Sequence, residues 1–144
     1  MLKEAQSWIT KFGLKPHPEG GYYNETYRGP SFGYGPPFNG QRSASTCIYF
    51  LLQENDFSAF HRLKSDEIWH FYVGSDIVII TISEKGTINE INLNQGHFQA
   101  VLPAGEWFGA YLKYPQSYAL VGCTVAPGFD FEDFEMGSRK ELLQ

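Results

Sequence analysis

Short segments with the alternating pattern of β-strands, each followed by a turn, fill most of the chain after residue 42. The clearest of them cover 43–53, 76–82, 87–93, 98–103, 106–112 and 118–125, and two more lie within 57–74. Polar turns rich in glycine separate them, as at Glu84-Lys85-Gly86 and Asn94-Gln95-Gly96. Regularly spaced short strands of this kind predict an all-β sandwich or barrel.

The residues before the strands predict a short N-terminal helix over 1–13. Ala5, Trp8 and Phe12 recur at helical spacing, and Gly13 is a helix stop signal. We expect Trp8 to pack this helix on a sheet. The chain of 144 residues is long enough for one large core, so we expect a single domain with a barrel over 14–125 and a C-terminal arm over 126–144.

Composition excludes several functional classes. Apolar residues make up 42% of the chain and the net charge is -5, which argues against a sequence-independent nucleic-acid binder. No apolar run approaches the roughly 18 residues that cross a membrane. Acid and amide groups near the N-terminus do not suit a signal peptide, so we expect a cytoplasmic protein. Cys47 and Cys123 lie in apolar runs and are most simply core thiols.

The stretch from Phe57 to Gly74 predicts two strands joined by a polar turn at 64–66. Period-two alternation places His61 on one strand face with Ala59, and Glu67 on a face with Trp69. We expect His61 and Glu67 to meet across neighbouring strands. A histidine beside a carboxylate can accept and return a proton near neutral pH, although the same contact also fits a purely structural pair.

The spacing of His61, Glu67 and Gly74 resembles the first conserved motif of the cupin superfamily. Leu63 stands where that motif has its second histidine. A second motif is similar around Pro103-Ala104-Gly105, but Phe108 takes the place of its histidine. Metal-binding cupins usually supply three histidines and one glutamate. The resemblance therefore implies no metal here, and no other cofactor, unless residues such as His70 or Gln99 are recruited.

The whole chain is similar to the cupin-5 family. The matching segments are 17–21 (HPEGG), Arg42 before the strand at 48–52, 61–70, 103–107 and 125–131. The resemblance implies a double-stranded β-helix, the cupin jelly roll, with a ligand cavity inside it and a homodimeric assembly. The superfamily includes metal-independent dTDP-4-dehydrorhamnose 3,5-epimerases, which use acid–base chemistry within the barrel.

We expect His61 and Glu67 to be the catalytic residues of such a cavity. The expected ligand-binding residues are Arg42, Tyr49, Trp69, Gln99 and Trp107. Arg42 either clamps a phosphate or carboxylate or bridges Asp66 or Glu67, and the aromatic residues either stack on a ligand or fill the core. Glu19 and Glu25 are expected in solvent, although Gly20 and Gly21 also let Glu19 approach a ligand.

Three functions fit these patterns. The first is a metal-independent isomerase or epimerase of a polar, sugar-nucleotide-like substrate, with His61 as acid and base. The second is a non-catalytic small-molecule binder, and the third is a metal-dependent enzyme with an atypical ligand set. We expect a small-molecule ligand and a second copy of the chain as partners, without nucleic acid or membrane.

Two segments outside the predicted barrel carry expectations of their own. The loop over 29–40 is either a lid or an oligomer contact. In the C-terminal arm, Phe129, Phe131 and Phe134 alternate with acidic residues and predict a segment packed over the barrel wall. Ser138 is expected to cap a last short helix containing Leu142 and Leu143.

Overall fold

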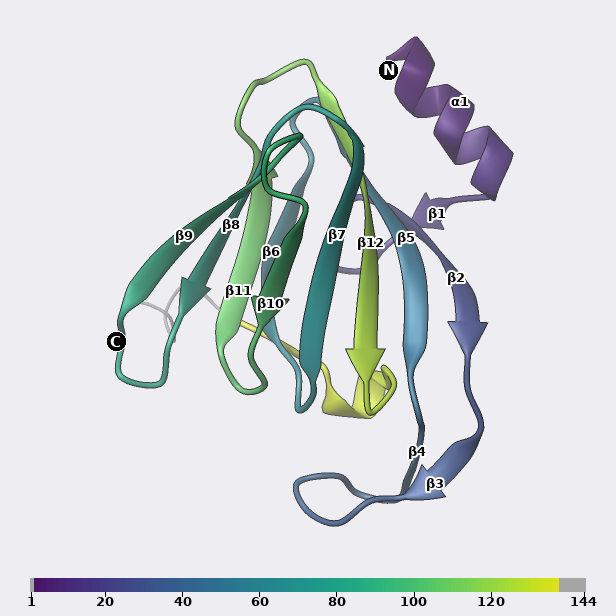
Figure 1. Cartoon of the computed structure of the whole chain (residues 1–144), viewed down its shortest axis with the longest axis vertical. Coiled ribbons are helices and arrows are strands. Elements are labelled where there is room, and N and C mark those ends of the chain that lie inside the picture. The colour runs from purple at the N-terminus through teal and green to yellow at the C-terminus, as the bar shows by residue number, and fades with distance from the viewer. Residues whose placement is uncertain (1, 138–144) are drawn as a thin grey trace.

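A computed structural model describes residues 2–137 of the chain (Figure 1). Its elements are α1 (Lys3–Phe12), β1 (Lys15–Pro16), β2 (Tyr22–Arg28), β3 (Ser31–Gly33), β4 (Gln41–Ser43), β5 (Thr46–Gln53), β6 (Phe57–Arg62), β7 (Asp66–Gly74), β8 (Ile77–Ile82), β9 (Ile88–Leu93), β10 (Gln99–Leu102), β11 (Trp107–Leu112), β12 (Tyr118–Ala126), a 3-10 turn η1 (Phe131–Asp133) and β13 (Glu135–Met136). The strands β8, β9 and β11 begin one residue later than predicted, because the polar residue before each of them (Asp76, Thr87 and Glu106) belongs to the turn.

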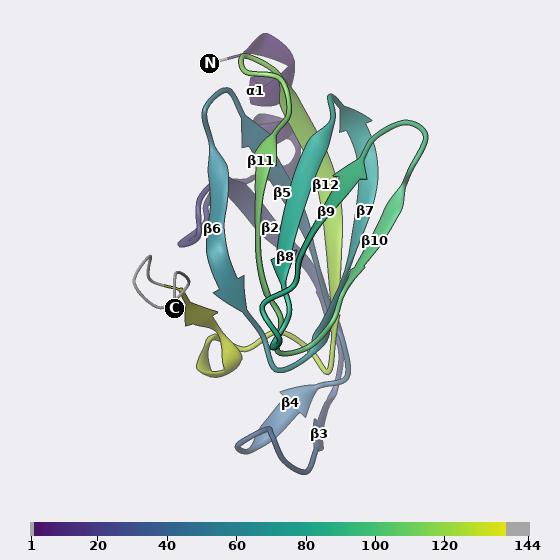
Figure 2. The ribbon, with the colours of Figure 1, turned by 90° about the vertical axis from the view of Figure 1, so that its left-hand side faces the viewer.

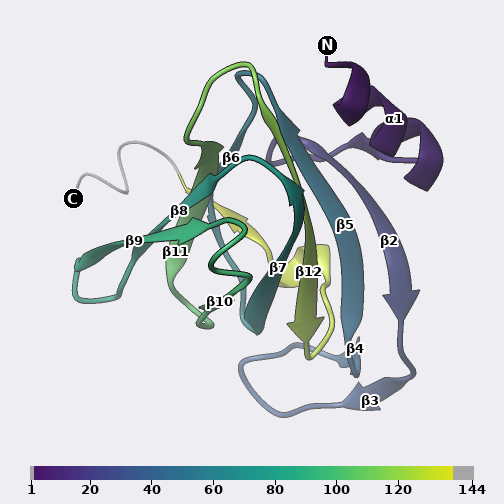
Figure 3. The same ribbon diagram turned by 45° about the horizontal axis from the view of Figure 1, so that its top comes forward.

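Two antiparallel sheets face each other and enclose the core (Figure 2). The six-stranded sheet has the order β1-β2-β5-β12-β7-β10, and the five-stranded sheet has the order β13-β6-β11-β8-β9. Figure 3 shows the interior between the sheets and α1 outside it, against β5. The predicted all-β jelly roll with a short N-terminal helix is confirmed.

The alternation along β5 explains how one strand serves two packing layers. Phe50 and Leu52 point between the sheets into the main core. Leu51 points outward and packs in a second cluster with Ala5 of α1, and Tyr49 stacks on Phe12 at 4.2 Å between ring centroids. Both faces of β5 are therefore covered, as the apolar residues on both of its faces predict.

The predicted strand–turn–strand unit over 57–74 is present as β6 and β7. Its two strands do not pair with each other, because β6 belongs to the five-stranded sheet and β7 to the six-stranded sheet. The turn crosses from one sheet to the other. His61 and Glu67 thus come from opposite walls of the barrel, and the prediction that they meet across neighbouring strands is wrong.

The alternation predicted along β6 is also interrupted. Phe108 of β11 lies opposite His61, whereas Ala110 lies opposite Ser58, so two residues of β6 face Gly109. This β-bulge puts His61 on the same buried face as Ser58 rather than with Ala59.

The C-terminal arm closes one end of the barrel, where β5 begins and β12 ends (Figure 1). Arg42 forms a buried two-point ion pair with Asp133 of the arm, with both N–O distances at 2.8 Å. Hydrogen bonding to Asp133 raises the pKa of the Arg42 guanidinium further above its ordinary range. The sequence interpretation that paired Arg42 with Asp66 or Glu67 is therefore wrong. The predicted cap at Ser138 and the helix with Leu142 and Leu143 lie outside the described residues.

Surface features bear on the expected partners. No helix within residues 2–137 is long and apolar enough to cross a membrane. An apolar groove crosses the outer face of the five-stranded sheet, with Phe57, Ile88 and Tyr111 exposed beside it. The β3–β4 hairpin, which contains the predicted loop, projects beyond the barrel (Figure 1). The homodimer expected from sequence stays a prediction.

We expect Leu52→Ala to lower the free energy of unfolding by about 2–5 kcal/mol, because Leu52 is fully buried in the main core. Ile88→Ala is the matched control, since Ile88 is 68% exposed on β9. That change should stay within about 0.5 kcal/mol of the wild type. Urea unfolding of the three proteins measures both effects, and equal losses would contradict this placement of the core.

Candidate functional site

A cavity of about 290 Å³ opens at the end of the barrel that the C-terminal arm closes. It lies between the ends of β2, β5, β7 and β12, the loop before β2, and the arm. Ionisable, aromatic and aliphatic side chains line it: His17, Glu19, Tyr23, Glu25, Arg28, Thr46, Ile48, His61, Leu63, Glu67, Cys123, Val125, Phe129, Asp130 and Phe131.

The loop between β1 and β2 carries His17 and Glu19 into this cavity. Backbone hydrogen bonds close it on itself, from His17 N–H to Gly21 O and from Gly20 N–H to His17 O. A further bond, from Ala59 N–H to Glu19 O at 2.8 Å, ties the loop to β6. Gly20 has a φ of 113° and lies directly against the carbonyl of Phe57, a position that only glycine fits. The loop is therefore held at a fixed place beside His61.

Glu19 and His61 form a buried pair. Glu19 Oε2 lies 2.8 Å from His61 Nε2, and the two residues are 8% and 2% exposed. The other ring nitrogen of His61, Nδ1, lies 2.7 Å from the carbonyl oxygen of Ala59. Because a carbonyl oxygen only accepts, Nδ1 carries a proton. His61 and Glu19 share a second proton, which then lies between Nε2 and the Glu19 carboxylate.

The surroundings of His61 favour its charged form. Burial by itself lowers the pKa of His61, but the charge and hydrogen bond of Glu19, together with the charge of Glu67, more than offset burial and leave the pKa raised. The imidazole ring packs between Phe108, at 4.1 Å between centroids, and Phe134 of the arm, at 5.2 Å. These two rings fix the orientation in which His61 meets Glu19.

Glu67 approaches from the opposite sheet and is 7% exposed. Its carboxylate accepts a hydrogen bond from the indole N–H of Trp69 and one from the Cys123 thiol. Burial raises the pKa of Glu67 to about 7, and the nearby charge of His61 opposes part of this rise. The carboxyl group is thus divided between its two protonation states near neutral pH, as a proton-transfer group requires.

His17 completes the ionisable interior. Burial lowers the pKa of His17, although Glu19, whose Oε1 lies 3.8 Å from Nδ1, acts against this. Its Nδ1 accepts the backbone N–H of Glu19 at 3.0 Å, which requires that this nitrogen carry no proton. His17 is therefore neutral and helps to position Glu19.

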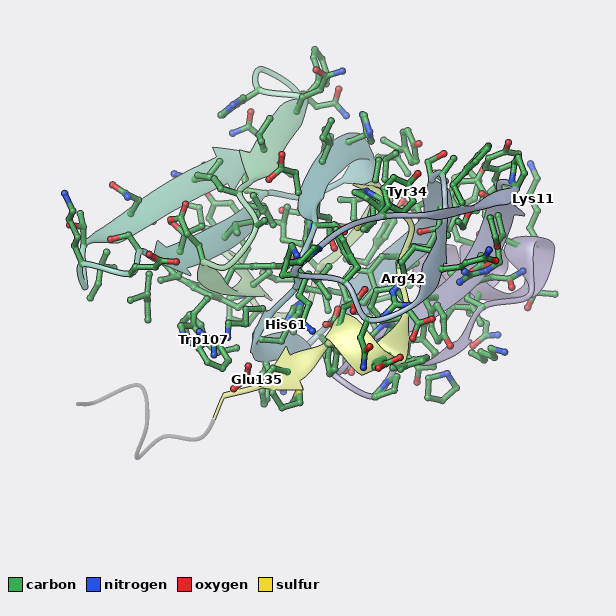
Figure 4. The ribbon with its side chains drawn as sticks, turned by 90° about the horizontal axis from the view of Figure 1, so that it is seen from below. Lys11, Tyr34, Arg42, His61, Trp107 and Glu135 are labelled. Atoms are coloured by element: carbon green, nitrogen blue, oxygen red, sulfur yellow. The ribbon has the colours of Figure 1, made fainter. Side chains whose placement is uncertain are left out.

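Several ligand-binding residues expected from sequence lie elsewhere. Gln99 is exposed on β10, although we expected it to point inward. Tyr49 faces α1, Arg42 is bound to Asp133, and the ring of Trp107, beside His61 in the view of Figure 4, lies under the guanidinium of Arg62. Trp69 is a core residue that contacts the site only through its bond to Glu67. Of the predicted site residues, His61 and Glu67 line the cavity.

The sequence interpretation only partly anticipated the contribution of the loop before β2. Glu25 is exposed on β2, as expected, at the edge of the cavity. Glu19 is buried rather than in solvent, so the alternative in which Gly20 and Gly21 let it approach a ligand site fits the structure. The available signal was Gly20-Gly21, which indicates a close backbone approach directly after a histidine and a glutamate. Arg28 and Asp130 carry no comparable signal, because the ends of distant segments bring them to the cavity.

The residues present do not fit the metal centre that many cupins contain. Leu63 and Phe108 occupy two of the expected ligand positions and offer no donor atom, and Glu19 engages the Nε2 atom of His61. Within residues 2–137, no three or more His, Cys, Asp and Glu side chains form a group that could hold a metal ion. The arrangement favours proton transfer between Glu67 and the Glu19–His61 pair.

The Glu67 carboxyl predicts a specific pH dependence of stability. Its pKa is about 7 in the folded chain and 4.5 without the fold, so the folded chain binds this proton more tightly. Its contribution to stability is therefore present below pH 4.5 and falls as the pH rises to about 7, by about 3 kcal/mol in all. The variant Glu67→Gln does not show this loss of stability, because the amide does not ionise. Its side-chain oxygen can still accept the Trp69 N–H.

Urea unfolding at several pH values tests this prediction. The stability of Glu67→Gln relative to the wild type should increase between pH 5 and pH 8. Glu90→Gln, at an exposed position on β9, should show no such trend. Parallel stability curves for the wild type and Glu67→Gln would contradict the assignment.

Gly20→Ala should displace Glu19 from His61, because a Cβ atom at this positive φ would overlap the carbonyl of Phe57. Strain of this kind costs about 1–3 kcal/mol. Gly33→Ala is the control, since nothing lies within 4 Å of its added Cβ. In an NMR titration, the pKa of His61 should fall in Gly20→Ala and stay unchanged in Gly33→Ala. An unchanged value in both variants would show that the glycine does not position Glu19.

The chain resembles known proteins along most of its length. It matches the family described as "Cupin superfamily (DUF985)" over residues 6–137. The uncharacterized protein YML079W of Saccharomyces cerevisiae is 29% identical over 146 residues, which cover 89% of this chain and 72% of the yeast protein.

Solved structures agree with this match. Protein SO0799 from Shewanella oneidensis is 37% identical with a TM-score of 0.85, covering 96% of this chain and 87% of that one. A hypothetical protein from Leishmania major is 31% identical with a TM-score of 0.87, covering 96% and 90%. Oxalate decarboxylase from Bacillus subtilis shares the fold alone, at 12% identity and a TM-score of 0.64 over 89% of this chain and 30% of that one. Since the family match spans nearly the whole chain, this protein belongs to the cupin superfamily, in the family described as DUF985.

Proposed function

We propose that this cupin binds a small polar molecule in the cavity at the arm end of its barrel and isomerises or epimerises it without a metal ion. The observation that carries the proposal is Glu67, a buried carboxyl group on the cavity wall with a pKa of about 7. The Glu19–His61 pair, which also holds a proton, lines the same cavity. Perturbed ionisable groups in a cavity are typical of catalytic sites.

The two groups suit a proton transfer from one side of a substrate to the other. Glu67 comes from β7 of one sheet and His61 from β6 of the other. Ionised Glu67 accepts the proton of a carbon next to a carbonyl, and the electrons of that C–H bond move toward the carbonyl oxygen. The Glu19–His61 pair then returns a proton to the carbon from the opposite side. Exchange with water restores both groups, so that atoms and charges balance.

This assignment gives His61 a different role from the one expected from sequence. Both of its ring nitrogens are engaged, Nδ1 with Ala59 O and Nε2 with Glu19. His61 is thus the holder of the shared proton, and Glu67 is the base. The same engagement favours the second candidate function, a binder without catalysis, in which the pair only shapes the cavity.

Deuterium exchange distinguishes catalysis from binding. Small carbonyl compounds that raise the melting temperature are incubated with the protein in D₂O and followed by NMR. The wild type should exchange the hydrogen next to the carbonyl. Glu67→Gln and His61→Asn should slow this exchange by about 10²–10⁴-fold, which is the usual contribution of a general acid or base.

The controls separate chemistry from folding. Glu90→Gln should exchange at the wild-type rate, and both site variants should keep a cooperative melt. A compound that binds the wild type and keeps all its C–H hydrogens would leave only the binding function. A wild-type exchange rate in Glu67→Gln would exclude Glu67 as the base.

A further inference from the structure

The charges around the cavity are unbalanced. Four carboxyl groups line it, those of Glu19, Glu25, Glu67 and Asp130. Only Arg28 and His61 among the lining side chains carry positive charge, since His17 is neutral. A ligand that enters the cavity therefore meets a negative potential, which attracts cations and repels anions.

Both positively charged side chains, Arg28 and His61, already bind carboxylate groups of the protein. Arg28 gives two hydrogen bonds to Glu25, at 2.8 and 2.9 Å, and a third to the carbonyl of Phe129 at 3.0 Å. His61 is bound to Glu19 at 2.8 Å. A phosphate or carboxylate on a ligand would have to displace one of these internal partners, and the displaced carboxylate would remain beside it.

Among residues 2–137, two carboxyl groups of the cavity accept no hydrogen bond from a positively charged side chain. Asp130 accepts the backbone N–H of Glu132 at 2.9 Å, and within residues 2–137 it forms no direct ion pair, although the charges of Arg28 and Arg42 lie close enough to interact with it. Glu67 has hydrogen bonds from an indole and a thiol, both of them uncharged donors. One carboxyl group stands at the rim and the other in the interior, so a ligand with hydrogen-bond donors can meet both.

Aromatic residues stand beside these carboxyl groups. Tyr23, Phe129 and Phe131 line the cavity, and Phe131 is 54% exposed next to Asp130. Aromatic rings next to carboxylates are a favourable surrounding for a positively charged nitrogen. At about 290 Å³ the cavity lies at the small end of ligand sites, which span about 300–1,000 Å³.

We propose that the cavity takes a small hydroxylated amine in its protonated form, such as an amino sugar, whose ammonium group binds between Asp130 and the aromatic rim while its hydroxyl groups face Glu67. This proposal rests on the cavity of the proposed function and names its ligand class. The sugar-nucleotide-like substrate expected from sequence suits the site poorly, because its diphosphate would face the carboxyl groups.

Matched compounds of different charge test the proposal. Glucose, glucosamine and glucose 6-phosphate form one set, and glycerol, serinol and glycerol 3-phosphate form another. Each is added to the full chain at constant ionic strength, up to about 50 mM, which detects binding with a Kd near 1 mM. We expect an amine to raise the melting temperature more than its neutral counterpart does, and the phosphates to have no effect. A larger shift with a phosphate, or none with either amine, would overturn the proposal.

Charge variants locate the bound amine. Asp130→Asn keeps the cap on Glu132 N–H but removes the charge, and should weaken amine binding about tenfold or more. Glu90→Gln, an equal charge change on the exposed face of β9, should leave binding unchanged. Equal affinity of Asp130→Asn and the wild type would exclude binding at this rim.

The two proposals can fail separately. If a phosphate-bearing compound binds and the hydrogen on its carbon next to the carbonyl exchanges in D₂O, the proposed ligand class is wrong and the acid–base function stands. If an amine binds, Asp130→Asn weakens it, and a carbonyl-bearing amine of the same class keeps its C–H hydrogens, the ligand class stands and catalysis is excluded.

Discussion

The hydrogen bond between Glu19 and His61 joins the two walls of the barrel at the end that the C-terminal arm covers. Glu19 is in the loop that precedes β2 of the six-stranded sheet, and His61 is on β6 of the five-stranded sheet. Neither group could be buried alone, because an isolated charge in an apolar interior is strongly unfavourable. Each makes the burial of the other acceptable. The pair thereby keeps a proton and a negative charge within a cavity that would otherwise be filled by apolar side chains.

The C-terminal arm holds this pair in place from outside. The two-point contact between Arg42 and Asp133 anchors the arm, and it places Phe134 flat against the His61 ring. Phe129 and Phe131 of the same arm form part of the cavity wall. This buried ion pair, together with the pairing of β13 with β6, therefore contributes to the orientation of His61 and to the shape of the entrance. The view in Figure 4 shows Arg42 and His61 at this end, beside the arm.

Local patterns predicted the fold far better than they predicted the site. Strand alternation and turn residues were enough for an all-β sandwich or barrel and for the β6–β7 unit, because these depend on neighbours in sequence. The jelly roll itself was implied by the resemblance to the cupin-5 family. The site depends on segments far apart, such as Glu19 against His61 and Asp133 against Arg42. The bulge in β6 also changed the face on which His61 lies, and period-two counting cannot detect an inserted residue. His61 and Glu67, which flank a turn whose position the sequence specifies, both line the cavity, and their catalytic role stays a prediction.

The departures from the metal-binding cupin pattern have one common consequence. Phe108 lies against the His61 ring where a metal-binding cupin has another histidine, and Leu63 adds a second apolar wall. Because Phe108 and Leu63 are apolar, they offer no polar atom to the Nε2 atom of His61. Without another partner this nitrogen would be a buried polar group with no hydrogen bond. Glu19, brought in by the loop with its two glycines, satisfies it. The carboxylate also supports a positive charge on the ring, as a metal ion would provide positive charge at this place in related folds. The interior thus keeps a local positive charge near Glu67, which the protonated ring of His61 carries.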